Sequence, residues 1–345
     1  MPTIKEVADL AGVSVGTVSH VVSGSVPVSE PLRLRVEAAI RQLDYHPNHV
    51  ARSLKTSRTR TFGIIVPDMT ISFYPLVIRG AETAAWRQGY SLIAVNSTDS
   101  AERQKELLTL FRSQRVEGIL LVVAAEPVPM MQISRLIDAA IPVVCLDRIP
   151  ENLPVDSVSV EDTSAAEMGT DHLIEMGYRR IAIVTGPVSL TNEKRRLHGY
   201  QHSLRRAGLP LDEELLWHSN VRPEDVAALC RQKLGSVNVD ALFCTNGPTA
   251  LGCLRALRDC KIETPGDVGF LTFDELTVDD LFKPSITTIV QPAYEIGFQA
   301  AEILFDRIQN KGEAASDPRT LRLPASLKIR ESTRRMLANA DLMLG

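Results

Sequence analysis

The sequence contains no apolar run that could span a membrane and few residues that mark metal or redox chemistry. No stretch reaches the roughly 18 to 20 apolar residues that cross a bilayer, and Met1 is followed by Pro-Thr-Ile-Lys rather than by a signal peptide. We therefore expect a cytoplasmic protein. Its five cysteines show no CxxC spacing and sit mostly in apolar runs, so we expect reduced core residues and no metal site.

The common catalytic and nucleotide-binding motifs are also missing. There is no GxGxxG after the first expected strand, no GxxxxGK[ST] and no GxSxG, and the seven histidines form no motif. We expect neither an enzyme nor a cofactor. What the chain does have is a globular composition, 44% hydrophobic and 23% charged over 345 residues, which is enough for one small domain and a two-lobed body.

The net charge of −4 is unevenly distributed. Residues 1–60 contain eight Lys or Arg and five Asp or Glu, so they carry +3 and the remainder carries −7. A small basic head on an acidic body is typical of a protein in which only the head contacts nucleic-acid phosphates. Ordinary surface scatter is the alternative, because +3 is a small excess.

The first 45 residues have the pattern of three short helices. Thr3, with a Glu three residues later, forms a capping box that predicts a helix over 4–10. Gly12 supplies a tight turn, Ser14 can cap a second helix, and Ser29 can cap a third. The arrangement predicts a helix-turn-helix, in which the second helix enters the major groove, although a plain helical hairpin remains the alternative.

The exposed side of the second helix carries the candidate base contacts. Val15 can lie against a thymine methyl group, and His20 can donate a hydrogen bond to a purine N7 or O6. The hydroxyl side chains and the helix N-terminus suit phosphates better than bases. The candidate DNA-contacting residues of the head are Thr3, Ser14, Val15, Gly16, Thr17, Ser19 and His20.

Residues 48–55, Asn-His-Val-Ala-Arg-Ser-Leu-Lys, form a short basic segment that favours a helix. Two turns are too few to be stable alone in water, so we expect this segment to fold only against a partner. Leu54 could then act as an apolar wedge in the minor groove. A plain linker is the alternative. The candidate DNA contacts here are Asn48, Val50, Ala51, Arg52, Leu54 and Lys55.

The rest of the chain alternates short apolar runs with helical stretches. Apolar runs without polar alternation predict strands buried on both faces, and therefore parallel sheets covered by helices. The expected strands are 62–66, 92–95, 118–123, 142–146, 181–184, 241–244, 268–273 and 287–290, and the expected helices are 74–88, 103–115, 165–176, 194–207, 223–234, 249–260 and 294–309. This pattern predicts a doubly wound α/β body.

Polar residues recur just after these expected strands. Because ligands of such folds bind beyond the carboxyl ends of the strands, these side chains predict a pocket for a hydroxyl-rich ligand. For any one of them, a cap or turn role is the alternative. The residues are Asp68, Asn96, Asp147 with Arg148, Asn246, Asp274 and Gln291, and Phe73 and Tyr74 could add an apolar face for a sugar ring.

The head and the segment after it resemble the lactose/galactose repressor family of bacterial transcriptional regulators. The resemblance rests on Thr-Ile-Lys-Glu-Val-Ala at 3–8, Ala-Gly-Val-Ser at 11–14, Thr-Val-Ser at 17–19, Tyr45, and Pro-Asn followed by Val-Ala-Arg-Ser-Leu at 47–54. It implies a homodimer that binds a near-palindromic operator and inserts paired leucines, here Leu54, into the minor groove. It also implies base reading by Val15, Gly16 and His20, the last in place of a more usual Arg.

The body resembles periplasmic sugar-binding proteins of the ribose type, to which that family is related. This resemblance implies effector contacts at Phe73, Tyr74, Asp147, Arg148, Arg196, Asn246, Asp274 and Gln291. Arg196 belongs to an Arg-x-x-Gly pattern that ends at Gly199 and opens a helix in the family. Val221 stands where many members carry a stacking aromatic residue.

We therefore predict an α/β protein with a three-helix helix-turn-helix head and a doubly wound, two-lobed body like a type I periplasmic binding protein. The expected domains are a DNA-binding head over 1–46, a hinge helix and linker over 47–60, an effector-binding and dimerisation body over 61–335, and a tail over 336–345 too short for a tetrameric coiled coil. The expected function is a transcriptional repressor controlled by a small polar effector, a sugar or sugar derivative. A solute-binding receptor without a DNA role is the alternative, and the direction of the effector's influence on DNA binding stays open.

Overall fold

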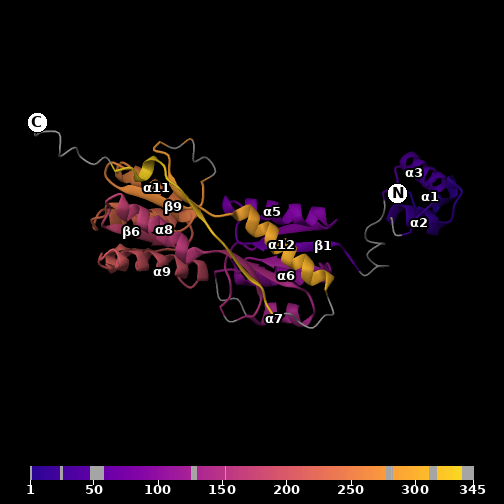
Figure 1. Cartoon of the computed structure of the whole chain (residues 1–345), viewed down its shortest axis with the longest axis horizontal. Coiled ribbons are helices and arrows are strands. Elements are labelled where there is room, and N and C mark those ends of the chain that lie inside the picture. The colour runs from indigo at the N-terminus through magenta and orange to yellow at the C-terminus, as the bar shows by residue number, and fades with distance from the viewer. Residues whose placement is uncertain are drawn as a thin grey trace, which may run out of the picture. The chain divides into compact units, whose positions relative to one another are not determined.

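The computed structural model divides the chain into two compact units, Met1–Thr59 and Arg60–Gly345, called here the head and the body (Figure 1). It describes residues 2–23, 26–46, 58–125, 130–151, 153–276, 281, 283–310 and 317–335. The candidate hinge residues Asn48, Val50, Ala51, Arg52, Leu54 and Lys55 and the tail 336–345 lie outside the described residues.

The head contains the three expected helices, α1 (Ile4–Ala11), α2 (Val15–Ser23) and α3 (Glu30–Leu43). The capping box of α1 is present, because Glu6 N donates to Thr3 Oγ1 over 3.3 Å and Thr3 N donates to Glu6 Oε2 over 2.6 Å. The prediction for Ser29 is wrong in one respect. Ser29 occupies the N-cap of α3, but its side chain makes no capping hydrogen bond. A proline in the first turn of α3 leaves one fewer backbone N–H to satisfy.

Gly12 sets the turn between α1 and α2. Its φ of 62° lies in the left-handed region that glycine adopts without strain. The Arg35 guanidinium of α3 closes this turn by donating from Nε to Ala11 O over 3.0 Å and from Nη2 to Gly12 O over 2.8 Å. A small apolar core holds the three helices together, with Val7, Val18 and Val36 fully buried in it.

The body has two lobes, each built on a six-stranded sheet in the described residues. The N-terminal lobe has the strand order β2-β1-β3-β4-β5-β11, and the C-terminal lobe has the order β7-β6-β8-β9-β10-β12. All described strand pairs are parallel except β10 with β12. The strands are β1 (Thr61–Val66), β2 (Ser91–Asn96), β3 (Gly118–Leu121), β4 (Val143–Leu146), β5 (Asp156–Val160), β6 (Ile181–Thr185), β7 (Leu216–His218), β8 (Ala241–Cys244), β9 (Gly269–Phe273), β10 (Thr287–Val290), β11 (Thr320–Leu323) and β12 (Ser326–Lys328).

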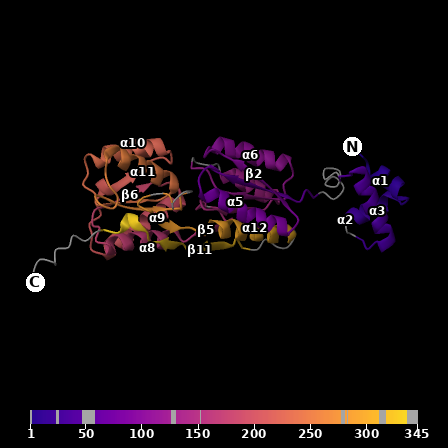
Figure 2. The ribbon, with the colours of Figure 1, turned by 90° about the horizontal axis from the view of Figure 1, so that it is seen from above.

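Helices cover both faces of each sheet, as expected for buried parallel strands (Figure 2). The N-terminal lobe has α5 (Phe73–Arg87) and α12 (Ala293–Gln309) on one face and α6 (Ala101–Ser113) and α7 (Met130–Asp138) on the other. The C-terminal lobe has α8 (Asp162–Glu175) and α9 (Thr191–Arg206) on one face and α10 (Pro223–Leu234) and α11 (Gly247–Cys260) on the other.

Three chain crossovers connect the lobes: β5 to α8, β10 to α12, and β11 to β12. The sequence reading missed α7, β5, β7, β11 and β12. The four strands among them are short, edge-placed or polar, and β5 (Asp-Ser-Val-Ser-Val) has three polar residues although all five of its residues are buried. Several helices also begin up to three residues before their predicted starts, which matters at α8 and α9, whose first turns carry polar residues of the candidate site.

The helices α5 and α12 cross in direct backbone contact and lie side by side in Figure 1. A Cβ added to Gly80 would stand 1.9 Å from Tyr294 O, and one added to Gly297 would stand 1.9 Å from Val77 O. Only glycine allows so close an approach. Because α12 directly follows a crossover, this contact anchors the end of the crossover to the N-terminal lobe.

Four of the five cysteines are buried and unbridged, while Cys260 is exposed, contrary to the expectation that the cysteines are core residues.

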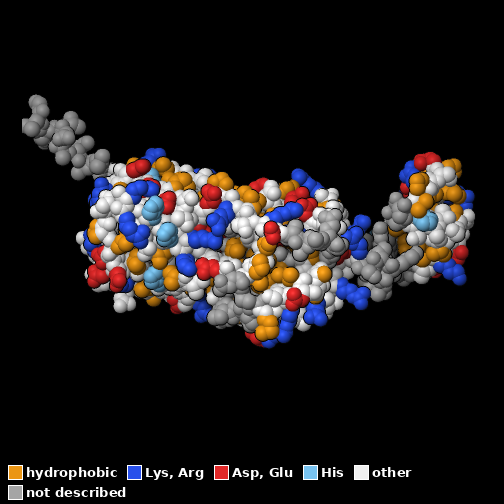
Figure 3. All heavy atoms as spheres, turned by 60° about the horizontal axis from the view of Figure 1, so that its bottom comes forward, with side chains coloured by type: hydrophobic (Ala, Val, Ile, Leu, Met, Phe, Trp, Pro, Cys, Tyr) orange, Lys and Arg blue, Asp and Glu red, His pale blue; other side chains and the backbone are white. Residues whose placement is uncertain are grey.

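Within the described part of the chain, every helix falls short of the length and hydrophobicity that a membrane span requires. Figure 3 shows Lys and Arg side chains interspersed with Asp and Glu over one face of the body, so the acidic excess is not gathered there.

Candidate functional site

The helix-turn-helix of the head presents the N-terminal part of α2 to solvent. Val18 is fully buried against the other helices, whereas Val15 is 43% exposed and Gly16 and His20 are also exposed. This is the division of faces that insertion into the major groove requires. An apolar side chain and an imidazole on the exposed side are suited to a thymine methyl group and to a purine edge.

The hydroxyl residues of this region have structural partners. Ser14 Oγ accepts a hydrogen bond from Thr17 N over 3.1 Å and lies 3.0 Å from Thr17 Oγ1, so Ser14 caps α2. Thr3 is exposed and engaged in the capping box of α1. Ser19 is partly buried. Phosphate contact by these four residues remains a prediction.

In the body, the eight candidate effector residues of the sequence line one compartment between the lobes. This inner compartment has a volume of about 30 Å³. Its lining also includes residues that the sequence reading did not assign to effector binding. The lining residues are Ile71, Phe73, Tyr74, Asp147, Arg148, Asn192, Glu193, Arg196, Val221, Asn246, Pro248, Asp274 and Gln291.

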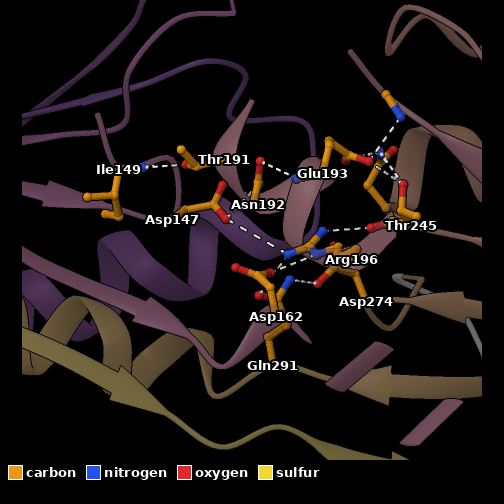
Figure 4. A network of polar contacts seen from close by, with 12 residues as sticks. Asp147, Ile149, Asp162, Thr191, Asn192, Glu193, Arg196, Thr245, Asp274 and Gln291 are labelled. Carbon is orange, nitrogen blue, oxygen red and sulfur yellow. Dashed lines mark hydrogen bonds and ion pairs between the residues drawn. The ribbon is translucent and has the colours of Figure 1, made fainter. Parts of the chain in front are cut away.

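Arg196 lines this compartment, contacts several members of a polar network (Figure 4) and is 2% exposed. Its Nε donates to Asp162 Oδ1 over 2.8 Å, Nη1 to Thr245 O over 2.6 Å, and Nη2 to Gln291 Oε1 over 3.3 Å. The guanidinium carbon also lies 4.2 Å from the centre of the Phe273 ring. Arg196 is in the second turn of α9 and not at its start, because α9 begins at Thr191.

Two aspartates receive hydrogen bonds from side chains of the compartment. Asp147 Oδ1 accepts from Asn192 Nδ2 over 3.0 Å and Asp147 Oδ2 from Tyr74 Oη over 3.1 Å. Asp274 Oδ1 accepts from Gln291 Nε2 over 2.7 Å. The Asn192 contact joins the strand end of the N-terminal lobe to α9 of the C-terminal lobe. Ligand binding in this compartment would therefore act on a contact between the lobes.

Burial dominates the electrostatics of the compartment. It raises the pKa of Asp162 to about 7, although the neighbouring Arg196 opposes this change, and it raises the pKa of Asp274 to about 6. Burial alone would lower the pKa of Arg196, but the carboxylates around it, led by Asp162 and Glu193, raise it above its ordinary value. Arg196 is therefore held as a cation, while Asp162 and Asp274 resist ionisation.

Arg148 is already paired on the N-terminal side of the compartment. Its Nη1 donates to Asp99 Oδ1 over 2.5 Å and to Val123 O over 3.3 Å. Its Nε is buried and has no hydrogen-bond partner in the described residues. A buried donor without a partner is costly, so this N–H is suited to a ligand oxygen or a water.

The sequence reading missed Asn192, Glu193 and Asp162. Glu193 accepts hydrogen bonds from Gly186 N over 3.0 Å, from Thr245 Oγ1 over 2.5 Å and from Asn246 Nδ2 over 2.8 Å, and so it fixes the Asn246 side chain. For Asn192 and Glu193 the sequence holds a signal, since polar residues follow β6 at the start of α9, although the predicted helix begins only at Lys194. For Asp162, at the start of α8, no local pattern indicates its burial against Arg196.

A second and larger space adjoins the inner compartment. This outer cavity has a volume of about 570 Å³ and shares Ile71, Arg148, Val221 and Pro248 with the inner compartment. The strand-end residues Asp68 and Asn96 line it and not the inner compartment. Its other lining residues are Pro67, Thr70, Ser72, Thr98, Asp99, Arg222, Pro223, Gly247, Leu251 and Leu276.

The comparisons with known proteins agree with both units. Residues 3–48 match the model of bacterial regulatory proteins of the lacI family, and residues 170–333 match that of a periplasmic binding protein-like domain. The ribose operon repressor of Escherichia coli (strain K12) is 33% identical over 309 residues, covering 89% of this chain and 93% of its own. The transcriptional repressor PurR of Vibrio parahaemolyticus is 33% identical over 340 residues, covering 97% and 100%.

Solved structures show the same fold. The complex of the transcriptional regulator CelR with cellobiose is 32% identical with a TM-score of 0.72, covering 96% of this chain and all of that one. The lac repressor dimer bound to operator and the anti-inducer ONPF is 24% identical with a TM-score of 0.83, covering 96% and 99%.

The chain belongs to the lacI family of bacterial regulatory proteins. It is a DNA-binding transcriptional regulator of the repressor type, controlled by a small effector. This result confirms the predicted function and fold class, and it decides against a solute-binding receptor without a DNA role.

Proposed function

We propose that this chain represses transcription as a homodimer bound to a near-palindromic operator. We further propose that an uncharged, hydroxyl-rich effector, a sugar or sugar derivative, controls its affinity for this operator. In this proposal residues 1–46 read the operator, a hinge over 47–60 inserts Leu54, residues 61–335 bind effector and partner, and the tail over 336–345 adds no tetramer contact. The chain acts in the cytoplasm and catalyses no reaction. The observation that carries the proposal is that all eight candidate effector residues line one interlobe compartment.

The chemistry of the compartment favours an uncharged ligand. Asp147, Glu193 and Asp274 line it with two guanidinium groups, and each guanidinium already contacts a carboxylate, Asp162 for Arg196 and Asp99 for Arg148. A phosphate or carboxylate would meet an excess of acidic groups there. Hydroxyl groups can both donate to carboxylate and amide oxygens and accept from N–H groups. The relatives named for a ribose operon and solved with cellobiose support a sugar.

The control is a coupling between two sites. A ligand that contacts both lobes favours one lobe arrangement, and this arrangement determines whether the two hinge segments of a dimer can meet in the minor groove. The expected coupling is about 1 to 3 kcal/mol in operator affinity.

The test is fluorescence anisotropy of a labelled duplex copied from the region upstream of the chain's own gene, at fixed moderate salt. We expect specific binding of this duplex that one or more neutral sugars change about 5- to 150-fold. The Leu54→Ala variant should lose most of the specific affinity and retain nonspecific phosphate attraction. Unchanged specific affinity in this variant would contradict the hinge role, and indifference of DNA binding to every sugar would contradict the effector class.

A further inference from the structure

The outer cavity has two unlike walls. The N-terminal lobe contributes mostly polar side chains, Asp68, Thr70, Ser72, Asn96, Thr98, Asp99 and Arg148, with Pro67 and Ile71 beside them. The C-terminal lobe contributes aliphatic and proline side chains, Val221, Pro223, Pro248, Leu251 and Leu276, together with Arg222. A sugar ring has hydroxyl groups along its edge and C–H groups on its faces. Such a slot can therefore satisfy the edge on one wall and cover a face on the other.

Polar atoms on the N-terminal wall are available to a ligand. Asp68 Oδ1 accepts from Thr70 N and Oγ1, and Asp99 Oδ1 accepts from Arg148 Nη1 and Ala125 N. In the described residues, the second oxygen of each carboxylate takes part in no hydrogen bond, and the same holds for the Nδ2 of Asn96, whose Oδ1 accepts from Met69 N. These acceptors and this donor could bind ligand hydroxyl groups without breaking an internal bond.

The volumes show where the bulk of a ligand must lie. The inner compartment holds about 30 Å³, whereas the outer cavity holds about 570 Å³, within the range of roughly 300 to 1,000 Å³ that small-molecule sites occupy. Val221 lines both spaces. Because Val221 lines both, a large aromatic side chain at this position would take up space where the two adjoin.

A further cavity of about 550 Å³ also borders the inner compartment, through Phe73, Asp274 and Gln291, but its charged groups are less available to a ligand. Its charged groups are already paired, since Glu275 Oε1 accepts from Lys328 Nζ and from Arg330 Nη2 over 2.8 Å each. A ligand that extended into it would have to compete with these ion pairs.

From this geometry, and resting on the proposed function, we infer that the effector is longer than one sugar ring. The inner compartment, of about 30 Å³, is smaller than a sugar ring, so both rings of a neutral disaccharide, or of a glycoside with a ring-sized aglycone, lie mainly in the outer cavity. The nearer ring directs its hydroxyl groups to the inner polar groups, and the further ring lies between the polar wall and Val221. A single ring held by the inner groups would leave most of the outer cavity filled with water.

The test is isothermal titration calorimetry of the full-length protein with matched pairs: glucose with cellobiose and with maltose, galactose with lactose, and methyl with phenyl β-glucoside. We expect at least one two-ring member to bind at least tenfold more tightly than its one-ring counterpart. Val221 lines both spaces, so Val221→Trp should weaken the two-ring members at least tenfold more than their one-ring counterparts. Thr70→Trp, at an exposed residue that lines the outer cavity and not the inner compartment, should lower the two-ring affinity at least tenfold and leave the one-ring affinity within about threefold.

Val188→Trp is the matched control, because Val188 is an exposed valine of the same lobe outside the cavity lining, and its affinities should not change. Equal affinity within every pair, or equal weakening of both members by Val221→Trp, would overturn the inference. If a one-ring sugar then still altered operator binding, the proposed function would stand. Failure of every sugar to bind would overturn both.

Discussion

Asp147 and Asp274 occupy equivalent positions in the two lobes. They directly follow β4 and β9, which hold the same place in the two sheets. Both have left-handed backbones, with φ of 58° and 67°. Each donates its N–H to the next strand, Asp147 to Val158 O over 3.1 Å and Asp274 to Ile289 O over 3.0 Å.

The equivalence of Asp147 and Asp274 places one aspartate of each lobe in the same compartment. Left-handed backbone costs a non-glycine residue on the order of 1 to 3 kcal/mol, although Asp tolerates it better than most residues. The neighbouring strands hold both residues in this conformation. A ligand that binds both aspartates contacts both lobes, which is what an effector needs in order to favour one lobe arrangement over another.

Asp162→Asn should change the pH dependence of stability. The pKa of Asp162 is raised from its ordinary 3.8 to about 7, so the folded chain holds this proton more tightly than the unfolded chain. This group's contribution to stability is full below about pH 4 and is lost as the pH rises to about 7. Urea unfolding should show the stability of wild type relative to Asp162→Asn falling by at least about 1 kcal/mol between pH 5 and pH 8.

The control for this measurement is Asp259→Asn. Hydrogen bonds from Arg258 lower the pKa of Asp259, so its contribution is lost only in more acidic solution. The stability difference between wild type and Asp259→Asn should therefore stay constant from pH 5 to pH 8. A difference for Asp162→Asn that is flat or grows with pH would contradict the raised pKa.

Arg196→Ala should destabilise the body and not only weaken effector binding. It leaves Asp162, Asp147 and Asp274 buried without their cation, and breaking a buried ion pair from one side costs about 3 to 5 kcal/mol. Arg196→Lys keeps the charge but cannot reproduce three divergent N–H bonds, so it should cost less stability and still impair effector affinity. Urea unfolding and calorimetry measure the two effects. Arg205 is an exposed arginine of the same helix, so Arg205→Ala should change the free energy of unfolding by no more than about 0.5 kcal/mol. An equally small cost at Arg196 would show that its bonds do not stabilise the fold.

Gly80→Ala should destabilise the N-terminal lobe. The new methyl group would overlap Tyr294 O at 1.9 Å, and this neighbour is backbone, so α5 and α12 would have to separate. Overpacking of this kind costs typically about 1 to 3 kcal/mol, occasionally more. Gly235→Ala is the matched control, since its added Cβ meets carbonyl oxygens only at 3.6 Å. In thermal unfolding, the melting temperature of Gly80→Ala should be clearly lower than that of Gly235→Ala. Similar melting temperatures would mean that the close helix crossing does not exist in solution.

His20→Ala should weaken specific operator binding by about 1 to 3 kcal/mol and relax the base preference at one position of each half-site. The reason is that the imidazole lies on the exposed side of α2, where a donor to a purine edge carries sequence information. Anisotropy titrations with an operator and with a scrambled duplex of equal length measure the effect. Equal losses on both duplexes would assign His20 to phosphate contact.

Local patterns in the sequence were sufficient to predict the helices of the head and most helices and strands of the body. Hydrophobic periodicity gave the helices of the head and the buried strands, because a covered face must be apolar wherever it packs. Residues after the expected strands gave seven of the eight candidate effector residues, family resemblance added Arg196, and all eight line one compartment. Effector contact by these residues stays a prediction.

Only the tertiary structure decided which distant residues meet. Asp162 lies at the start of a helix, and nothing local indicates that it is buried against Arg196. The outer cavity has one wall from each lobe, and Gly80 faces an α12 backbone more than 200 residues later in the sequence. Periodicity specifies the apolar face of each element but not its partner. The packing of α8 against α9 sets the pairing of Asp162 with Arg196. The crossovers set the other two relationships, because they return the chain from one lobe to the other.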